Sequence, residues 1–248
     1  MIKYYKSFHF LKVYESWFIY KFRLKDIFTL NVHFHVKNSR HSIFGIKEIS
    51  YTLEIDLEKS VEDITANFSK QIRQQSKIAE KEETVCYFHT NIDEFVDFFN
   101  DFASKKDTWT TSKKRMIELG GNVKMSFAVN NGQMLAAHSY LIDSELGIVR
   151  HLHSATKRLD ESYDRNLIGR ANKYLTVTDI FYFKQQGFKI FDFGGFAKDT
   201  KDESLKGINN YKLLFGGKLV PCFNYFSVNY WLLKNLIAKM GIAGKVDN

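Results

Sequence analysis

Two spacings of apolar residues recur along this chain, and they predict different elements. Between residues 28 and 36 apolar side chains occupy every second position, which indicates a strand that turns one face to a core. The apolar face holds Phe28, Leu30, Val32, Phe34 and Val36, and the opposite face holds Asn31, His33 and His35. Similar short runs predict further strands at 51–57, 85–89, 123–129, 134–142 and 147–154.

A spacing of three and four residues predicts the helices. Ser60 with Asp63 has the form of an N-cap, and the apolar residues that follow predict one helix over residues 61–81. Asn91 with Glu94 opens another helix in the same way. That helix reaches to about residue 102. Further helices are expected at 112–119, 163–186 and 231–240.

The order of these elements directs attention to one region. The turn Asn130-Asn131-Gly132-Gln133 joins two strands into a hairpin, a third strand follows, and the chain then enters the helix at 163–186. After that helix, residues 189–193 form a short apolar run that stops at Gly194-Gly195, where the backbone can turn sharply or approach a ligand closely. A second glycine pair, Gly216-Gly217, follows a segment that carries lysine. We therefore expect a site where the strand meets the first glycine pair.

Composition indicates a globular protein with an anionic partner. Of the 248 residues 44% are hydrophobic, and the net charge of +8 favours a nucleotide, coenzyme, nucleic acid or membrane surface. Cys86 and Cys222 lie far apart, which is neither a disulfide framework nor a zinc site and indicates a reducing compartment. No apolar run approaches the roughly 18 residues of a spanning helix, and lysines interrupt the N-terminal segment, so we expect a cytoplasmic protein.

A resemblance to a known superfamily rests on three segments. Phe191-Asp192-Phe193-Gly194-Gly195, then Gly207-Ile208, then Tyr211-Lys212-Leu213-Leu214-Phe215-Gly216-Gly217 together resemble the FemAB-like branch of the GNAT acyltransferases. The start of the long helix, Asn166-x-x-Gly169-x-Ala171, is similar to the pyrophosphate motif of that superfamily, Gln/Arg-x-x-Gly-x-Gly/Ala, with Asn in the first place. The resemblance covers residues 50–226.

The resemblance implies an α/β fold of the α+β kind, with tandem GNAT-like halves and mixed, mostly antiparallel sheets flanked by helices. We place the halves at 1–84 and 85–248, with the CoA site in the second. The implied activity is that of an acyl-CoA-dependent N-acyltransferase. It would move an acetyl or 3-hydroxybutanoyl group to the amine of a dTDP-linked amino-dideoxyhexose, such as dTDP-3-amino-3,6-dideoxygalactose, for surface polysaccharide synthesis.

Two alternatives to the nucleotide-sugar reading stay open. One is a FemAB-type transferase that takes an aminoacyl group from tRNA and acts on a peptidoglycan precursor. The other is a non-catalytic basic module that binds RNA or anionic lipid, which predicts steep salt dependence. The acyltransferase reading expects no nucleic acid and no stable membrane insertion.

Direct attack of the sugar amine on the thioester requires a base, a donor to the oxyanion and a proton for the leaving sulfur. Asp192 and His153 are the expected bases, Tyr211 is the expected acid, and a backbone N–H within 149–153 is the expected oxyanion donor. Each side chain also has a structural alternative: Asp192 can cap the glycine turn, His153 can be a hydrogen-bonded sheet residue, and Tyr211 can pack in the core. Neither cysteine has basic neighbours in sequence, so no covalent intermediate is expected.

The resemblance also implies binding residues. The residues expected to hold the coenzyme phosphates are Asn166, Gly169, Arg170, Ala171 and Lys212. The residues expected at the acceptor nucleotide are Trp109 and Phe196, as stacking walls, with Arg73 and Lys77 as a phosphate clamp. No metal is expected, because His151 and His153 have no third ligand at a recognised spacing.

Overall fold

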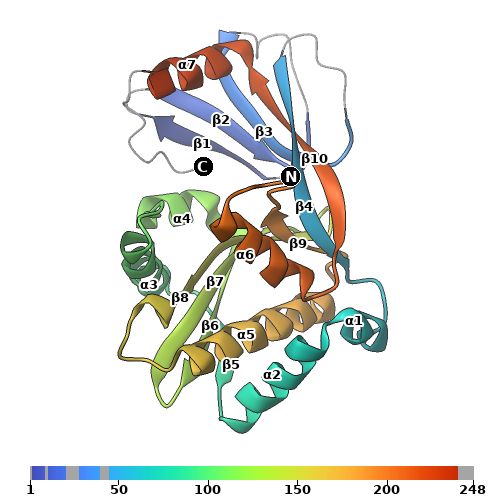
Figure 1. Ribbon diagram of the computed structural model, residues 1–248. Coiled ribbons are helices and arrows are strands. Elements are labelled where there is room, and N and C mark those ends of the chain that lie inside the picture. The colour runs from blue at the N-terminus through green and yellow to red at the C-terminus, as the bar shows by residue number, and fades with distance from the viewer. Residues whose placement is uncertain (1, 9–10, 21–27, 40–44, 240–248) are drawn as a thin grey trace. The chain divides into compact units, whose positions relative to one another are not determined.

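The computed structural model describes residues 2–8, 11–20, 28–39 and 45–239. Over these residues it holds ten strands and seven helices (Figure 1). The chain forms two compact units, which we call the terminal unit, residues 1–52 with 219–246, and the central unit, residues 53–218. This division differs from the expected boundary after residue 84, because the C-terminal segment groups with the N-terminal strands. A tandem of two GNAT-like halves stays a prediction.

The terminal unit is a small sheet with one helix. Its elements are β1 (Lys3–Phe8), β2 (Leu11–Trp17), β3 (Leu30–Val36), most of β10 (Lys218–Ser227) and α7 (Val228–Lys239). β1 pairs with β2 and β3 pairs with β10 in antiparallel fashion, whereas β2 and β3 are parallel. The terminal helix expected from the amphipathic tail is therefore present.

The expectation that β3 buries only one face is wrong. Asn31, His33 and His35 are buried along with their apolar neighbours, because the polar side chains find partners inside the unit. The Nδ1 atom of His33 lies 2.5 Å from the hydroxyl of Ser16, and the ring of His35 stacks on Trp17. Alternation of polar residues therefore did not mark a solvent face.

The sheet of the central unit runs in the order β4-β9-β8-β7-β6-β5. The strands are the end of β4 (Gly45–Asp56), whose residues before 53 belong to the terminal unit, then β5 (Val85–His89), β6 (Val123–Asn130), β7 (Gln133–Asp143), β8 (Ile148–Thr156) and β9 (Ile190–Gly195). β5, β6, β7 and β8 pair antiparallel in succession, and β9 is parallel to β8. The predicted hairpin and the third strand are confirmed, as is the mixed, mostly antiparallel α/β fold class.

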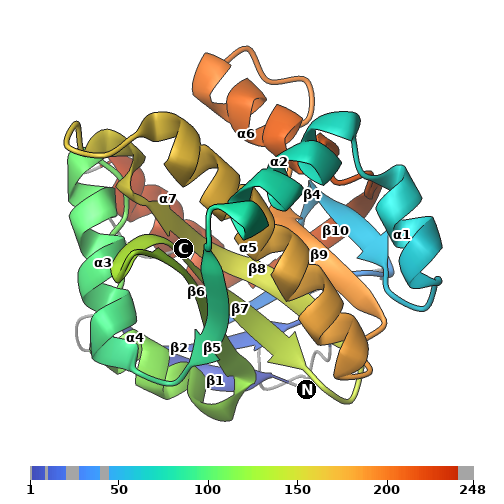
Figure 2. The ribbon, with the colours of Figure 1, turned by 90° about the horizontal axis from the view of Figure 1, so that it is seen from below.

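Helices cover both faces of this sheet (Figure 2). They are α1 (Val61–Asn67), α2 (Lys70–Lys81), α3 (Ile92–Lys105), α4 (Lys113–Leu119), α5 (Arg165–Gln185) and α6 (Glu203–Leu213). α5 packs on β6 and β7 with α2 beside it, and α3 packs on β8 from the other face. The two faces therefore have separate cores, one around Phe183 and Phe191 and one around Phe95 and Phe127.

The single helix expected over residues 61–81 is two helices. Phe68 is extended and Ser69 caps α2 by accepting from the N–H of Ile72. The Arg73 guanidinium turns back and donates to the carbonyl oxygens of Phe68 and Ala66, at the end of α1. The break is also where Gly216 packs, because a Cβ on that glycine would lie 2.2 Å from the carbonyl oxygen of Asn67. The second glycine pair thus serves close packing.

Candidate functional site

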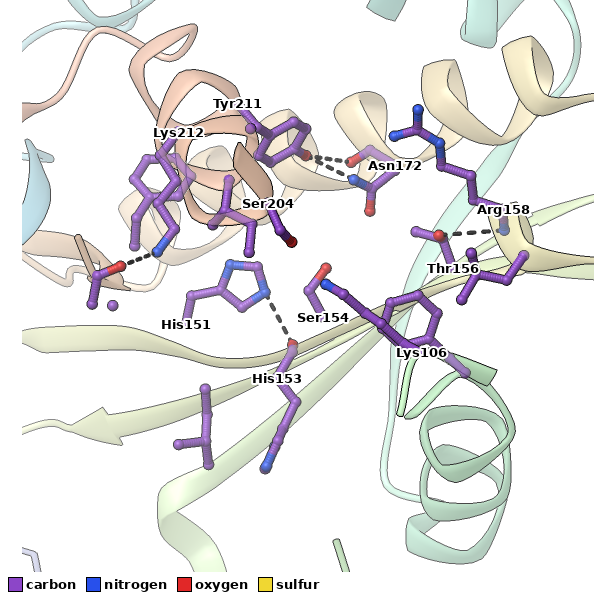
Figure 3. Close-up of a pocket in the computed structure, with 18 of the residues that line it drawn as sticks. Lys106, His151, His153, Ser154, Thr156, Arg158, Asn172, Ser204, Tyr211 and Lys212 are labelled. Carbon is purple, nitrogen blue, oxygen red and sulfur yellow. Dashed lines mark hydrogen bonds between the residues drawn. The ribbon is translucent and has the colours of Figure 1, made fainter. Parts of the chain in front are cut away.

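The central unit opens where β8 and β9 separate. The two strands pair over three positions only, the last being Arg150 with Asp192. Beyond that point residues 151–154 of β8 and 193–195 of β9 line a cavity of about 710 Å³, whose other walls include residues of α5 and α6 (Figure 3). The region selected from the sequence, at the first glycine pair, therefore lies on this cavity.

Asp192 holds the turn that ends β9. Its side chain is fully buried, and one carboxylate oxygen accepts from the N–H of Gly194 at 2.7 Å. Gly194 has φ of 76°, a left-handed conformation that favours glycine. The structural alternative for Asp192 is thus observed directly, whereas its role as a base stays a prediction.

A bulge in β8 turns His151 and His153 to opposite faces of the sheet. The register with β7 passes from Ser139 opposite His153 to Tyr140 opposite His151, so Leu152 is an extra residue. The ring of His151 lies against Tyr140 and His138, and the ring of His153 lies against Phe99. The two histidine side chains point in opposite directions (Figure 3). In a regular strand two histidines two residues apart would share a face. Here the bulge separates them, so His151 and His153 do not form a metal pair.

His153, one of the two expected bases, is enclosed on the α3 side. Its Nδ1 atom lies 2.7 Å from the hydroxyl of Ser139. Burial, followed by the charges of Arg115 and Arg150, lowers the pKa of His153 to about 3. His153 lines the cavity, but Nδ1 is engaged by Ser139 and the ring lies against Phe99, so its role as a base stays a prediction.

His151 was not among the expected bases, yet its geometry suits one. Its Nε2 atom lies 3.0 Å from the carbonyl oxygen of His153, so that nitrogen carries the proton and Nδ1 is left as the acceptor. Burial, followed by the charges of His138 and Lys212, holds the pKa of His151 well below its usual value. His151 is therefore a neutral imidazole in the cavity wall.

α6 supplies a lysine to the cavity. Asp202 caps this helix, which the sequence pattern did not predict, and Asn209 ties it to the backbone of Ala197. The Lys212 ammonium donates to the carbonyl oxygen of Gly195. Burial, followed by the charge of Arg150, lowers the pKa of Lys212 to about 8 against the opposing effect of Asp192.

The hydroxyl of Tyr211, the expected acid, contacts α5. It accepts from the Nδ2 amide of Asn172 at 2.9 Å and lies 2.8 Å from the hydroxyl of Thr176. Burial raises the pKa of Tyr211, so the hydroxyl keeps its proton. The ring of Tyr211 and these hydroxyl contacts hold α6 against α5, as the alternative of packing in the core expects. The role of Tyr211 as an acid stays a prediction.

The charged side chains of the cavity wall are mostly cationic. Among the residues that line it are four cationic side chains, Lys106, Arg150, Arg158 and Lys212, and one carboxylate, Glu203. Cationic walls around a partly buried space favour an anionic ligand because the local dielectric constant is low.

Four of the residues expected to hold a coenzyme pyrophosphate lie at the start of α5 beside carboxylates, whereas Lys212 lies on α6 in the cavity wall, and their assignment stays a prediction. Asp164 caps the helix and accepts from the N–H of Asn166 at 2.8 Å, so a carboxylate occupies the position of an anion. Gly169 and Ala171 fall in the second turn, where N–H groups bond within the helix. Arg170 binds Glu82 through two hydrogen bonds of 2.8 and 2.6 Å.

The expected nucleotide-binding residues do not meet at the cavity. Arg73 and Lys77 line a second hollow of about 370 Å³ between α2 and α5. Trp109 is 42% exposed in the segment between α3 and α4, and Phe196 packs with the core cluster that contains Phe215. Their assignment to an acceptor nucleotide stays a prediction.

Comparisons with known proteins agree on the fold. No family model matches the chain, and no curated protein matches it in sequence. FemX, in its crystal structure, superposes with a TM-score of 0.66 at 10% identity, covering 94% of this chain and 85% of its own. A C-terminal domain assigned to a lysylphosphatidylglycerol synthetase from Agrobacterium fabrum gives 0.62 at 10%, covering 98% and 86%. L-PGS from Bacillus licheniformis gives 0.61 at 9%, covering 99% and 86%.

These similarities show that the chain has a fold like that of FemX. At identities near 10% they carry no information on substrates. No helix among the described residues is both long and apolar enough to cross a membrane.

Proposed function

We propose that this protein is an N-acyltransferase that passes an acyl group from an activated ester to the amine of an anionic acceptor bound in the cavity. The observation that carries the proposal is that a neutral imidazole, His151, and a half-buried lysine, Lys212, line the same cavity, whose charged side chains are mostly cationic. The similarity of fold to FemX, to the domain assigned to a lysylphosphatidylglycerol synthetase and to L-PGS supports a transferase.

In the proposed reaction the amine of the acceptor attacks the carbonyl carbon of the donor. The nitrogen must be uncharged when it attacks, so a base has to take a proton from it. Nδ1 of His151 is available for this step, because the contact of Nε2 with the His153 carbonyl fixes the tautomer. A C–N bond forms and the carbonyl oxygen becomes an oxyanion.

We assign to Lys212 the stabilisation of the negative charge that develops on the oxyanion and on the leaving atom. With a pKa of about 8 it is an ammonium group at neutral pH, and its position in the cavity suits a donor to the oxyanion and to the leaving atom. The backbone of Leu152, which has no partner residue in the described β7–β8 register, offers a further N–H. When the ester bond breaks, the leaving oxygen or sulfur takes a proton from Lys212, which regains one from solvent.

The start of α5 favours an aminoacyl ester over acyl-CoA as the donor. A pyrophosphate at this helix would lie beside the carboxylates of Asp164 and Glu82, and like charges at that distance repel. This observation favours the FemAB-type reading, in which aminoacyl-tRNA is the donor and a peptidoglycan precursor is the acceptor.

A second candidate, acyl-CoA with a dTDP-linked amino sugar, is favoured by a different observation. The cationic side chains of the cavity wall suit a diphosphate on the acceptor, as in dTDP-3-amino-3,6-dideoxygalactose. In this reading the coenzyme binds away from the start of α5, and Lys212 protonates the leaving thiolate.

The test offers both donor classes to the purified protein. One arm follows transfer of a labelled amino acid from charged tRNA to a nucleotide-linked peptidoglycan precursor. The other follows free thiol released from acetyl-CoA or 3-hydroxybutanoyl-CoA in the presence of dTDP-amino sugars. We expect transfer in one arm that requires the amine acceptor. Failure of both arms, with no stabilisation of the protein by any acceptor, would overturn the proposal.

A matched pair of lysine variants controls the assay. Lys212→Ala is expected to lower kcat at least 100-fold, because it removes the ammonium group from the reacting atoms. Lys206→Ala on the same helix removes an exposed lysine that pairs with Glu203 and is not among the residues that line the cavity. It is expected to retain activity, and an equal loss in both variants would contradict the role of Lys212.

A further inference from the structure

A buried polar chain runs from the sheet to the cavity. His138 on β7 and Asp179 on α5 are both fully inaccessible to solvent, and Nδ1 of His138 lies 2.9 Å from Oδ2 of Asp179. Nε2 of His138 lies 2.9 Å from Oδ1 of Asn172. Asn172 lines the cavity and donates from Nδ2 to the hydroxyl of Tyr211.

Both ring nitrogens of His138 face oxygen acceptors. The carboxylate oxygen beside Nδ1 already accepts from the hydroxyl of Tyr140 at 2.5 Å. The amide oxygen beside Nε2 belongs to a side chain whose nitrogen is committed to Tyr211. An imidazole donates to two acceptors only when both nitrogens carry protons, so these hydrogen-bond partners match the imidazolium form.

Charge balance supports the same assignment. An ionised carboxylate without a partner cation is costly to bury, and Asp179 is enclosed by the sheet and α5. The titratable groups that face the pair are Tyr140, His151, Cys86 and Tyr211. Burial, with Asp179 next, raises the pKa of Tyr140 and brings that of Cys86 to about 12, so these groups remain neutral.

Two sets of contacts connect the His138–Asp179 pair to residues that line the cavity. The first runs through Asn172 and Tyr211 to α6, whose next residue is Lys212. The second is direct, because the ring centroids of His138 and His151 lie 4.6 Å apart. A positive charge at His138 disfavours protonation of its neighbour, which keeps His151 an acceptor.

We propose that His138 and Asp179 form a buried ion pair that positions α6 and keeps the adjacent His151 neutral. Both are positioning residues, since they act through Asn172, Tyr211 and His151 and do not line the cavity. This inference rests on the proposed function for its catalytic meaning, whereas the ion pair itself is a property of the folded protein.

The first experiment reads the protonation of the pair directly. Nitrogen-15 spectra of histidine-labelled whole protein at pH 7.5, assigned with His138→Gln, are expected to show both ring nitrogens of His138 protonated. His151 is expected to be neutral with its proton on Nε2. In Asp179→Asn, His138 is expected to lose one proton. A neutral His138 in the unsubstituted protein would overturn the proposal, whether or not a substrate has been found.

The second experiment separates positioning from folding. Asp179→Asn keeps the shape of the side chain and is expected to lower kcat at least tenfold while KM for the acceptor changes less than twofold. The matched control is Asp143→Asn, at a carboxylate that is also buried but lies outside the network. It is expected to retain kcat. An active Asp179→Asn variant with unchanged kcat would overturn the positioning role, and absence of any transfer by the unsubstituted protein would refute only the proposed function.

Discussion

A Cβ atom placed on Gly194 would lie 2.9 Å from the carbonyl oxygen of His151. The two residues belong to β9 and β8 at the point where the strands diverge, so a side chain there would press on the wall that carries His151. The lack of a side chain at residue 194 thus sets how closely the two strands approach at the cavity.

We therefore expect Gly194→Ala to lower the free energy of unfolding by about 1–3 kcal/mol, because its φ of 76° and the close backbone atom both oppose a methyl group. Denaturant unfolding measures the change. Gly195→Ala is the control for stability, since a Cβ there meets no atom within 4 Å. Equal stability of the two variants would show that the strands can separate without cost.

The charge of Lys212 predicts a dependence of the rate on pH. Its pKa of about 8 means that the ammonium form is lost as the pH rises through that value, so kcat is expected to fall at higher pH. In Lys212→Arg the guanidinium stays charged, and the decline near pH 8 is expected to disappear even if the rate is lower throughout. A decline at the same pH in both variants would assign it to another group.

Sequence reasoning predicted the elements better than it predicted the site. Ser60 and Asn91 cap helices as expected, because capping depends on residues three apart. The bulge at Leu152 puts His151 and His153 on opposite faces of the sheet, and nothing in the local sequence pattern marks such an insertion, so the sequence did not show how differently the two rings are placed.

Contacts between residues far apart in the sequence account for much of the remaining difference between the expected and the observed site. Glu82 binds Arg170 although 88 positions separate them, so an arginine at a helix start looked available for phosphate. Asp179 was not selected from the sequence either, although it is a polar residue within the buried face of α5. A buried acid in a helical stripe is a signal that can be read from sequence, but its partner His138 becomes apparent only when β7 is placed against α5.

The low pKa of His153 predicts that the folded protein loses stability in acid. Its pKa is about 3 in the folded protein and near 6.5 in an unfolded chain, so between these values the unfolded state binds more protons. The free energy of unfolding is therefore expected to decrease as the pH falls from 6.5 towards 3. In His153→Gln, thermal unfolding is expected to show a smaller loss over that range. A loss equal to that of the unsubstituted protein would assign the acid sensitivity to other groups.

The ion pair of Arg170 with Glu82 allows the coenzyme assignment to be tested against a structural one. Because both hydrogen bonds join α5 to the residue that follows α2, Arg170→Ala is expected to lower the free energy of unfolding by about 1 kcal/mol. Glu82→Gln is expected to show a similar loss, and the double variant is expected to lose less than the sum, since the two residues share one interaction. If instead Arg170→Ala leaves stability unchanged and raises KM for acyl-CoA, the guanidinium leaves Glu82 to bind the coenzyme, and the motif at the start of α5 is a phosphate site after all.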